Sequence, residues 1–254
     1  MKLFPLTWIA FLFISVFPED LIKENPYNQP LENNPTVRES TVDLQVRVGE
    51  KLYVFGKAQG TLDKVKVGMH VLPFSQNQKI EGIHSDFHQV TWKRLKDGSI
   101  QIQSTYKPWP ALLTWLVLPD GRLKMEATSA NTNGRPLDQL GLGFDFPEEE
   151  LKKIAVNNQE IGKPEQNSGF NSFTTAWFEF DYVKLLIRSE LSGLALNTHF
   201  ATANSSHSDL VISFPSVELN PAESNSPGPN PGAQAPARAV STDLNKMILW
   251  FDFH

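Results

Sequence analysis

The carboxylates are the most numerous residues that could carry chemistry, but their positions identify no catalytic pair. Glycoside hydrolysis requires two carboxyl groups about 5–10 Å apart across one bond, and a chain with 28 Asp and Glu residues offers many arbitrary pairs. Asp97 and Asp120 each precede a glycine, where turn geometry explains an aspartate. The acidic run 148–150 follows Pro147, a position where acids favour the start of a helix. We therefore predict no catalytic carboxylate.

The histidines offer a second possible chemistry, metal binding. His84 and His88 flank Asp86 in the segment EGIHSDFHQV. On a helix, this spacing would place both imidazoles on one face, as in a metal-binding pair. Gly82 before His84 and a strand pattern after the segment favour a loop or an extended chain instead. We expect these residues, together with His199 and His207, to be surface or partly buried structural histidines, and we predict no metal site.

Aromatic residues are better candidates for ligand contact, because the C–H faces of sugars stack on aromatic rings. The chain contains 6 Trp, 4 Tyr and 17 Phe. Trp115 and Trp250 lie in apolar strand patterns and are predicted core residues. Trp109 lies between two prolines in a predicted turn, three residues after Tyr106, and Trp177 follows a polar stretch. Trp109, Trp177 and Tyr106 are therefore the predicted carbohydrate contacts, with packing in the core as the alternative.

Composition excludes several other classes of protein. The chain has no cysteine, which excludes disulfides, thiolate nucleophiles and zinc sites that use cysteine. The net charge is −5, and no basic stripe is present, so a nucleic acid partner is not expected. The sequence contains no phosphate-binding loop, dinucleotide fingerprint or nucleophile elbow. We predict no cofactor.

The N-terminus has the pattern of a targeting segment. Lys2 precedes an apolar run from Leu3 to Phe17, which is typical of a secretory signal and too short to span a membrane comfortably. We predict a signal peptide over residues 1–17, export to the periplasm or the cell exterior, and no membrane span in the mature chain. The alternative is a terminal strand or helix packed on the domain. Residues 18–40 are polar and rich in Pro and Asn, and are predicted to be a linker.

The remaining residues, 41–254, carry the pattern of an antiparallel β-sandwich. Two Asp-Gly turns, at 97–98 and 120–121, predict hairpins. One short helix is predicted from Pro147 to Lys153, and long loops are predicted at 157–174 and 220–241. Many short strands with little helix favour an all-β sandwich. Alternating or apolar segments fall at 41–48, 52–55, 62–67, 90–95, 100–103, 111–118, 123–127, 140–146, 182–188, 194–200, 210–214 and 247–253.

Four segments of this pattern resemble a known family. The segments are GEKLYVFGKAQGTLDKVKVGMHVLPF at 49–74, DGRLKMEATSA at 120–130, LGLGFDFPEE at 140–149 and ILWFDF at 248–253. They resemble parts of the last domain of family 2 glycoside hydrolases of the β-galactosidase type. The similarity covers about residues 42–156 and, more loosely, 177–253. The family's hairpin motif Phe-x-Lys-x-x-Gly-x-Leu and the proline that ends its second strand are matched here by Phe55, Lys57, Gly60, Leu62 and Pro73.

The resemblance implies an antiparallel super-sandwich of the galactose-mutarotase type. In the family, this domain follows a catalytic barrel, which supplies two glutamates, and it helps to wall the sugar site. A chain of 254 residues with strand patterns throughout has no room for such a barrel. The family's Trp-x-Gly-x-Gly-Pro loop and its Asn-Arg or Asp-Arg pair are also absent, because the corresponding stretch reads KKIAVNNQEIGKPEQ.

The resulting expectation is a carbohydrate-associated domain that is not catalytic alone and that acts with a barrel domain or barrel chain. Such a chain should not hydrolyse aryl β-galactosides by itself. Two alternatives remain open. One is a stand-alone enzyme of the mutarotase type, similar to an aldose 1-epimerase. The other is a structural or interaction domain with no sugar site.

Overall fold

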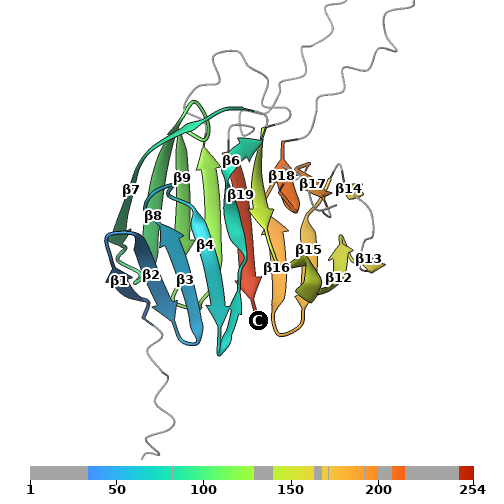
Figure 1. The fold of residues 1–254 in the computed structure, drawn as a ribbon, viewed down its shortest axis with the longest axis horizontal. Helices are drawn as coiled ribbons and strands as arrows, with labels where there is room; N and C mark the ends of the chain where they lie inside the picture. Colours follow the sequence, from blue (N-terminus) through green and yellow to red (C-terminus); the bar gives the residue numbers. More distant parts are fainter. Residues whose placement is uncertain are drawn as a thin grey trace, which may run out of the picture. The chain divides into compact units, whose positions relative to one another are not determined.

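The computed structural model of the chain describes residues 34–81, 83–128, 140–162, 168–170, 172–191, 193–199, 208–214 and 246–254. The described residues form three antiparallel β-sheets (Figure 1). Their one helical element is the short 3₁₀ turn Glu148–Glu150. The prediction of an all-β antiparallel sandwich is therefore confirmed.

The largest sheet has nine strands and forms one layer of the sandwich. All its neighbouring strands are antiparallel. In spatial order the strands are β13 (Gln159–Gly162), β12 (Leu151–Val156), β15 (Thr175–Phe180), β16 (Lys184–Ser189), β19 (Lys246–Phe253), β10 (Leu123–Thr128), β9 (Leu112–Val117), β8 (Ile100–Lys107) and β7 (Asp86–Arg94).

Two five-stranded sheets form the second layer. Ring contacts join each of them to the large sheet: Phe55 of the first sheet packs on Trp115, with centroids 6.0 Å apart, and Phe144 of the second packs on Phe251 at 5.4 Å. The first sheet has the order β1 (Thr36–Glu39), β2 (Asp43–Val48), β3 (Lys51–Gly56), β4 (Leu62–Val67) and β5 (His70–Leu72). The second has the order β14 (Ser168–Phe170), β17 (Ala195–Thr198), β18 (Leu210–Ser213), β11 (Gly141–Asp145) and β6 (Ser75–Glu81).

Alternation of side chains along the strands separates the core from the surface. In β10 and β19 every second residue is buried between the layers, and the residues between them lie half-buried on the outer face. Phe74, between β5 and β6, stacks on Phe144 and also contacts Phe251 and Phe253 of the large sheet. This aromatic cluster joins the second five-stranded sheet to the nine-stranded sheet.

Both predicted Asp-Gly hairpins are present. Gly98 joins β7 to β8 and Gly121 joins β9 to β10, and both glycines have positive φ angles, of 85° and 79°. A side chain at either position would favour a different backbone conformation, which explains why glycine follows the aspartate in each turn.

Several predicted elements differ from the structure. The helix predicted from Pro147 to Lys153 is wrong, because only Glu148–Glu150 form a 3₁₀ turn and β12 begins at Leu151. The long loop predicted at 157–174 contains the strands β13 and β14. The β-sandwich begins before Thr41, the predicted start of the domain, because all four residues of β1 pair with β2. Leu151, Ile154 and Val156 of β12 are buried, and this burial outweighs the local helix signal of the acidic run.

Some predictions lie outside the described residues. These are the signal peptide at 1–17, most of the linker at 18–40, and the loop at 220–241. Within the described ranges, no helix is long and apolar enough to cross a lipid bilayer.

The β3–β4 turn provides a test of this packing. Gly60 has φ +68°, and a Cβ atom there would lie 2.5 Å from Ser104 Oγ and 2.6 Å from a ring carbon of Phe87. Gly68 has a similar φ of +58°, but its nearest neighbour, Glu50 Oε2, is 3.8 Å away. We expect Gly60→Ala to lower the free energy of unfolding by about 2–4 kcal/mol, from backbone strain plus overpacking, and Gly68→Ala by about 1–2 kcal/mol, from strain alone. Denaturant unfolding measures both, and equal losses would contradict the packing described here.

Candidate functional site

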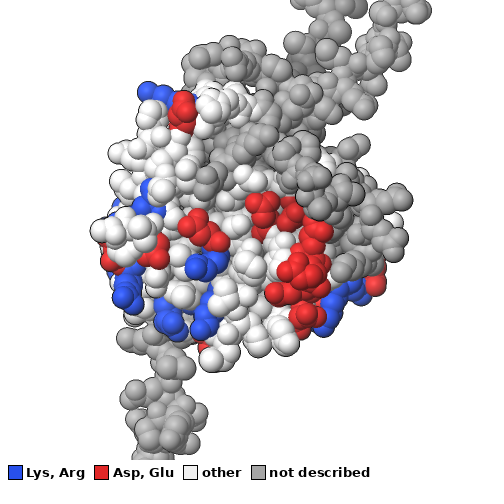
Figure 2. Space-filling view, viewed as in Figure 1, with Lys and Arg blue, Asp and Glu red and all other residues white. Residues whose placement is uncertain are grey.

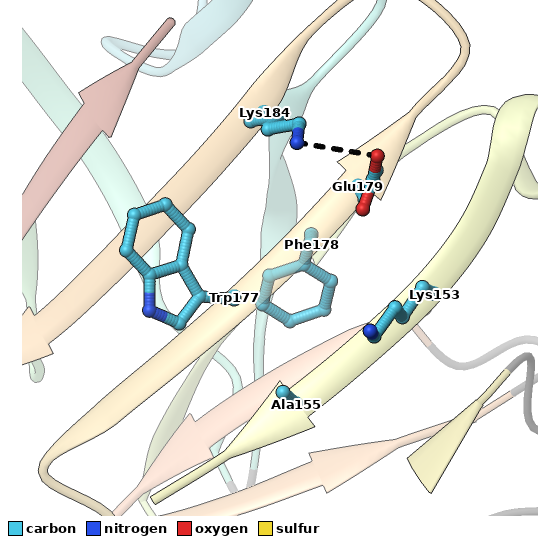
Figure 3. A pocket seen from close by; sticks show the side chains of 6 residues that line it. All are labelled: Lys153, Ala155, Trp177, Phe178, Glu179 and Lys184. Carbon is cyan, nitrogen blue, oxygen red and sulfur yellow. Dashed lines mark ion pairs between the residues drawn. The ribbon is translucent and has the colours of Figure 1, made fainter. Parts of the chain in front are cut away.

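A hollow of about 380 Å³ lies on the outer face of the nine-stranded sheet, over β12, β15 and β16 (Figure 3). β15 and β16 are consecutive strands that pair with each other, and β12 pairs with the other side of β15. Its lining combines one indole ring with oppositely charged side chains, and consists of Lys153, Ala155, Trp177, Phe178, Glu179 and Lys184.

The alternation of β15 sends Trp177 outwards and Phe178 inwards. Phe178 is buried in the core, where it contacts Phe146, whereas 39% of Trp177 is exposed. Trp177 faces Ala155 on β12 and Leu186 on β16 in the strand register. Because Ala155 is short, it leaves open space on the β12 side of the indole.

Charged groups surround this aromatic surface. Lys184 forms an ion pair with Glu179 across the β15–β16 pair at 3.3 Å, shown in Figure 3, and Lys153 forms one with Glu160 at 2.6 Å. Arg188 occupies the outer face of β16 beside Trp177, because it pairs in register with Thr175. The site therefore offers one exposed ring and several hydrogen-bonding groups, and the described residues of its lining include one carboxylate, Glu179.

Trp250 lies farther along the same outer face, in β19. The prediction that Trp250 is a core residue is wrong. The side chains of β19 alternate between the two faces of the sheet, so Leu249 and Phe251 are buried in the core and Trp250 lies half-buried on the outer face. Arg122 and Lys124 lie over its ring, 5.2 and 5.1 Å from the centroid. Its Nε1–H donates to Glu190 at 2.6 Å.

The groups around Trp250 form a closed network. Lys124 pairs with Glu126 and Glu190, and although partial burial opposes the charged form, these two carboxylates raise the pKa of Lys124 above its usual value. Lys246 adds a further ion pair to Glu126 at 2.7 Å. The ring and Nε1 of Trp250 therefore already have protein partners, unlike the exposed ring of Trp177.

Two of the three predicted carbohydrate contacts lie elsewhere, in the core. Trp109 is 2% exposed and packs edge-on against Phe214, with centroids 6.2 Å apart. Tyr106 is 4% exposed, packs on Phe87, and donates its hydroxyl to the Gln59 carbonyl at 2.8 Å; burial also raises the pKa of this phenol. The expectation that Trp109 presents its ring at the surface is wrong. The flanking prolines restrict the backbone, but the indole of Trp109 points into the core. Trp115, a predicted core residue, is also buried.

The histidines form no metal site in the described part of the chain. His84 is exposed and lies 3.4 Å from Asp86, and His88 is exposed on the extended strand β7. His199 is half-buried at the end of β17, and His207 lies outside the described residues. The described residues contain no group of three or more His, Asp or Glu side chains that could hold a metal ion.

A cluster of carboxylates that no sequence pattern predicts lies in the other layer. Asp209 precedes β18, Asp145 ends β11, and Glu148 begins the 3₁₀ turn. Burial, together with the charges of Asp145 and Glu148, raises the pKa of Asp209 to about 7. A hydrogen bond from the Phe146 N–H at 2.8 Å acts in the opposite direction, because it stabilises the carboxylate. Figure 2 shows a band of acidic side chains over the β15 and β18 region, while basic side chains gather over β1–β4.

Comparisons with protein-family models and with curated proteins found no match to this chain. The resemblance to the terminal domain of β-galactosidase-like enzymes therefore remains a prediction that rests on the sequence motifs alone.

The burial of the two tryptophans predicts opposite effects on stability. Replacing Trp109 with Ala should lower the free energy of unfolding by about 3–5 kcal/mol, because it opens a large cavity in the core. Replacing Trp177 with Ala should cost less than about 1.5 kcal/mol, because the ring is partly exposed and leaves no enclosed cavity. Denaturant unfolding of the two variants checks this, and a larger loss for Trp177→Ala would reverse the assignment of surface and core.

The raised pKa of Asp209 predicts a pH dependence of stability. Between about pH 4, where an unfolded aspartate ionises, and about pH 7, the folded chain holds a proton at Asp209 that the unfolded chain has released. Stability contributed by this group therefore falls as pH rises through that interval. Asp209→Asn removes the titration and keeps an oxygen that can accept from the Phe146 N–H. We expect the variant to gain stability relative to the wild type between pH 5 and pH 8, measured by urea unfolding; parallel curves would contradict the assignment.

Proposed function

We propose that this protein is a carbohydrate-binding β-sandwich, that its sugar site is the hollow beside Trp177, and that it is not catalytic alone. The observation that carries the proposal is the exposed indole on the outer face of the sheet, next to the space that Ala155 leaves open. An indole of this kind offers a flat apolar surface to the C–H face of a sugar ring.

The other residues of the hollow suit the polar edge of a sugar. Lys153, Lys184 and Glu179 place ammonium donors and carboxylate acceptors around the ring. These groups can hydrogen-bond to hydroxyls at the rim of a stacked sugar, and a small number of placed polar groups in an apolar lining is typical of ligand sites. The volume of about 380 Å³ lies near the lower end of the range for small-molecule pockets, about 300–1,000 Å³.

The same lining favours binding over hydrolysis. Glycosidases place two carboxyl groups on opposite sides of the scissile bond, and the hollow has one, Glu179, which is engaged with Lys184. A mutarotase-type mechanism needs a histidine acid with a glutamate base, and no histidine is among the lining residues that the structure describes. We therefore propose that any bond cleavage is carried out by a barrel domain or barrel chain with which this exported domain acts.

An interaction domain is the second candidate. It is favoured by exposed apolar side chains at the β4–β5 turn, where Met69 and Val71 protrude. His70 from the same turn stacks on the exposed Tyr182, with centroids 4.3 Å apart. Exposed apolar groups clustered in this way can mark a contact surface for another protein.

The proposed sugar site is tested by removing the indole. A glycan array on the purified chain first identifies a ligand, and calorimetric titration then gives its affinity. Trp177→Ala should weaken binding by about 1–3 kcal/mol through the loss of the stacking surface, with little change in melting temperature.

Trp92→Ala is the matched control, because Trp92 is exposed to a similar degree, 37%, but lies on β7 at the opposite edge of the sheet and bonds to Glu39. It should leave glycan affinity unchanged. Absence of binding to any glycan would contradict the proposal, and so would equal losses in the two variants.

A further inference from the structure

The charges around Trp177 indicate what kind of sugar the site would take. Three basic side chains lie on the outer face next to the indole: Lys153 on β12, and Lys184 and Arg188 on β16. The register places them there, because Trp177 pairs with Ala155 and Leu186, so each basic residue is diagonal to it. Diagonal neighbours across strands lie about 7–8 Å apart, within reach of long side chains.

Arg188 is the distinctive member of this group. Its side chain forms no hydrogen bond or ion pair with the residues that the structure describes. Its strand partners on this face are Thr175 and Trp250, which carry no negative charge. A guanidinium in this state keeps its donor fork available for a planar anion, which it can bind through two parallel hydrogen bonds.

The acids nearby pair with lysines and leave the charge of Arg188 without a paired carboxylate among the described residues. Glu179 and Glu160 each pair with a lysine, and these pairs are solvent-exposed, with side chains 40–60% accessible. Exposed ion pairs contribute little to stability, so the lysines can turn to a ligand at small cost. Asp252, next to Leu186 on β19, is already bonded to Lys51 at 3.1 Å.

We propose that the sugar bound at Trp177 is an acidic one, carrying a carboxylate or sulfate group that Arg188 binds while the indole stacks on the ring. Lys153 and Lys184 can turn from Glu160 and Glu179 and donate further hydrogen bonds at the rim. This inference rests on the proposed function, because it assigns a ligand class to the same site. It makes the chain, whose net charge is −5, a binder of anions at one local surface.

The test compares matched sugars that differ only in charge. The full chain is titrated with oligogalacturonate and with a neutral oligogalactoside of equal length and linkage. It is also titrated with a sulfated galactan and its desulfated form, so that carboxylate and sulfate are distinguished. We expect at least one acidic ligand to bind about tenfold more tightly than its neutral counterpart, with an affinity that falls as salt is raised.

The variants assign the effect to Arg188. Arg188→Gln should remove about tenfold of the affinity for the acidic ligand and leave the affinity for the neutral one unchanged, and Arg188→Lys should lose less because it keeps the charge. Arg47→Gln, on the exposed face of β2 in the other layer, is the control for general electrostatics and should change neither affinity. Melting temperatures confirm that the variants fold.

Each outcome decides between the two proposals. Equal affinity for acidic and neutral sugars would overturn the acidic class and leave the carbohydrate site in place. An acidic preference that survives Arg188→Gln, or that Arg47→Gln reduces equally, would overturn the role of Arg188. Absence of binding to every sugar would overturn the carbohydrate site together with its ligand class.

Discussion

The aromatic and aliphatic layer between the sheets is the constraint on which the other features depend. Phe74, Phe144 and Phe251 contact one another across the sandwich, with ring centroids 5.4–6.0 Å apart. Because side chains alternate along a strand, burying one set of residues in this layer fixes the other set on the outside. A slip of β15 by one residue would bury Trp177 and expose Phe178. The core packing therefore determines which residues are available to a ligand.

The sequence revealed the fold best where one face of a strand is apolar and the other polar. Segments 100–103 and 123–127 alternate strictly, and the structure places strands there with the expected burial. Prediction failed where local signals competed with burial. The segment that forms β12 follows an acidic run after a proline, a typical helix start, yet Leu151, Ile154 and Val156 pack in the core.

The candidate site was predictable only in part, for a related reason. Trp177 was singled out because it follows a polar stretch, whereas its exposure comes from its position in the strand β15, which the sequence did not reveal. Trp109 and Trp250 were assigned to the wrong environments. The prolines around Trp109 indicate a turn but not the direction of the ring, and the apolar run around Trp250 hides the alternation that places it outside. The Asp145–Asp209 cluster depends on the β11–β18 pairing, which no local pattern shows.

The two tryptophans on the outer face of the large sheet, Trp177 and Trp250, have different surroundings. At Trp250, two cations lie over the ring and Glu190 accepts its Nε1–H, so the protein itself supplies the partners that a ligand would otherwise provide. At Trp177, the neighbouring residues are the short Ala155 and the aliphatic Leu186, and the nearby lysines pair with glutamates instead of covering the indole. An indole left open beside groups that can change partners has the surface and the hydrogen-bonding capacity that a sugar requires. This contrast within one sheet face is why we propose the binding site over β12, β15 and β16, away from the β10–β19 centre.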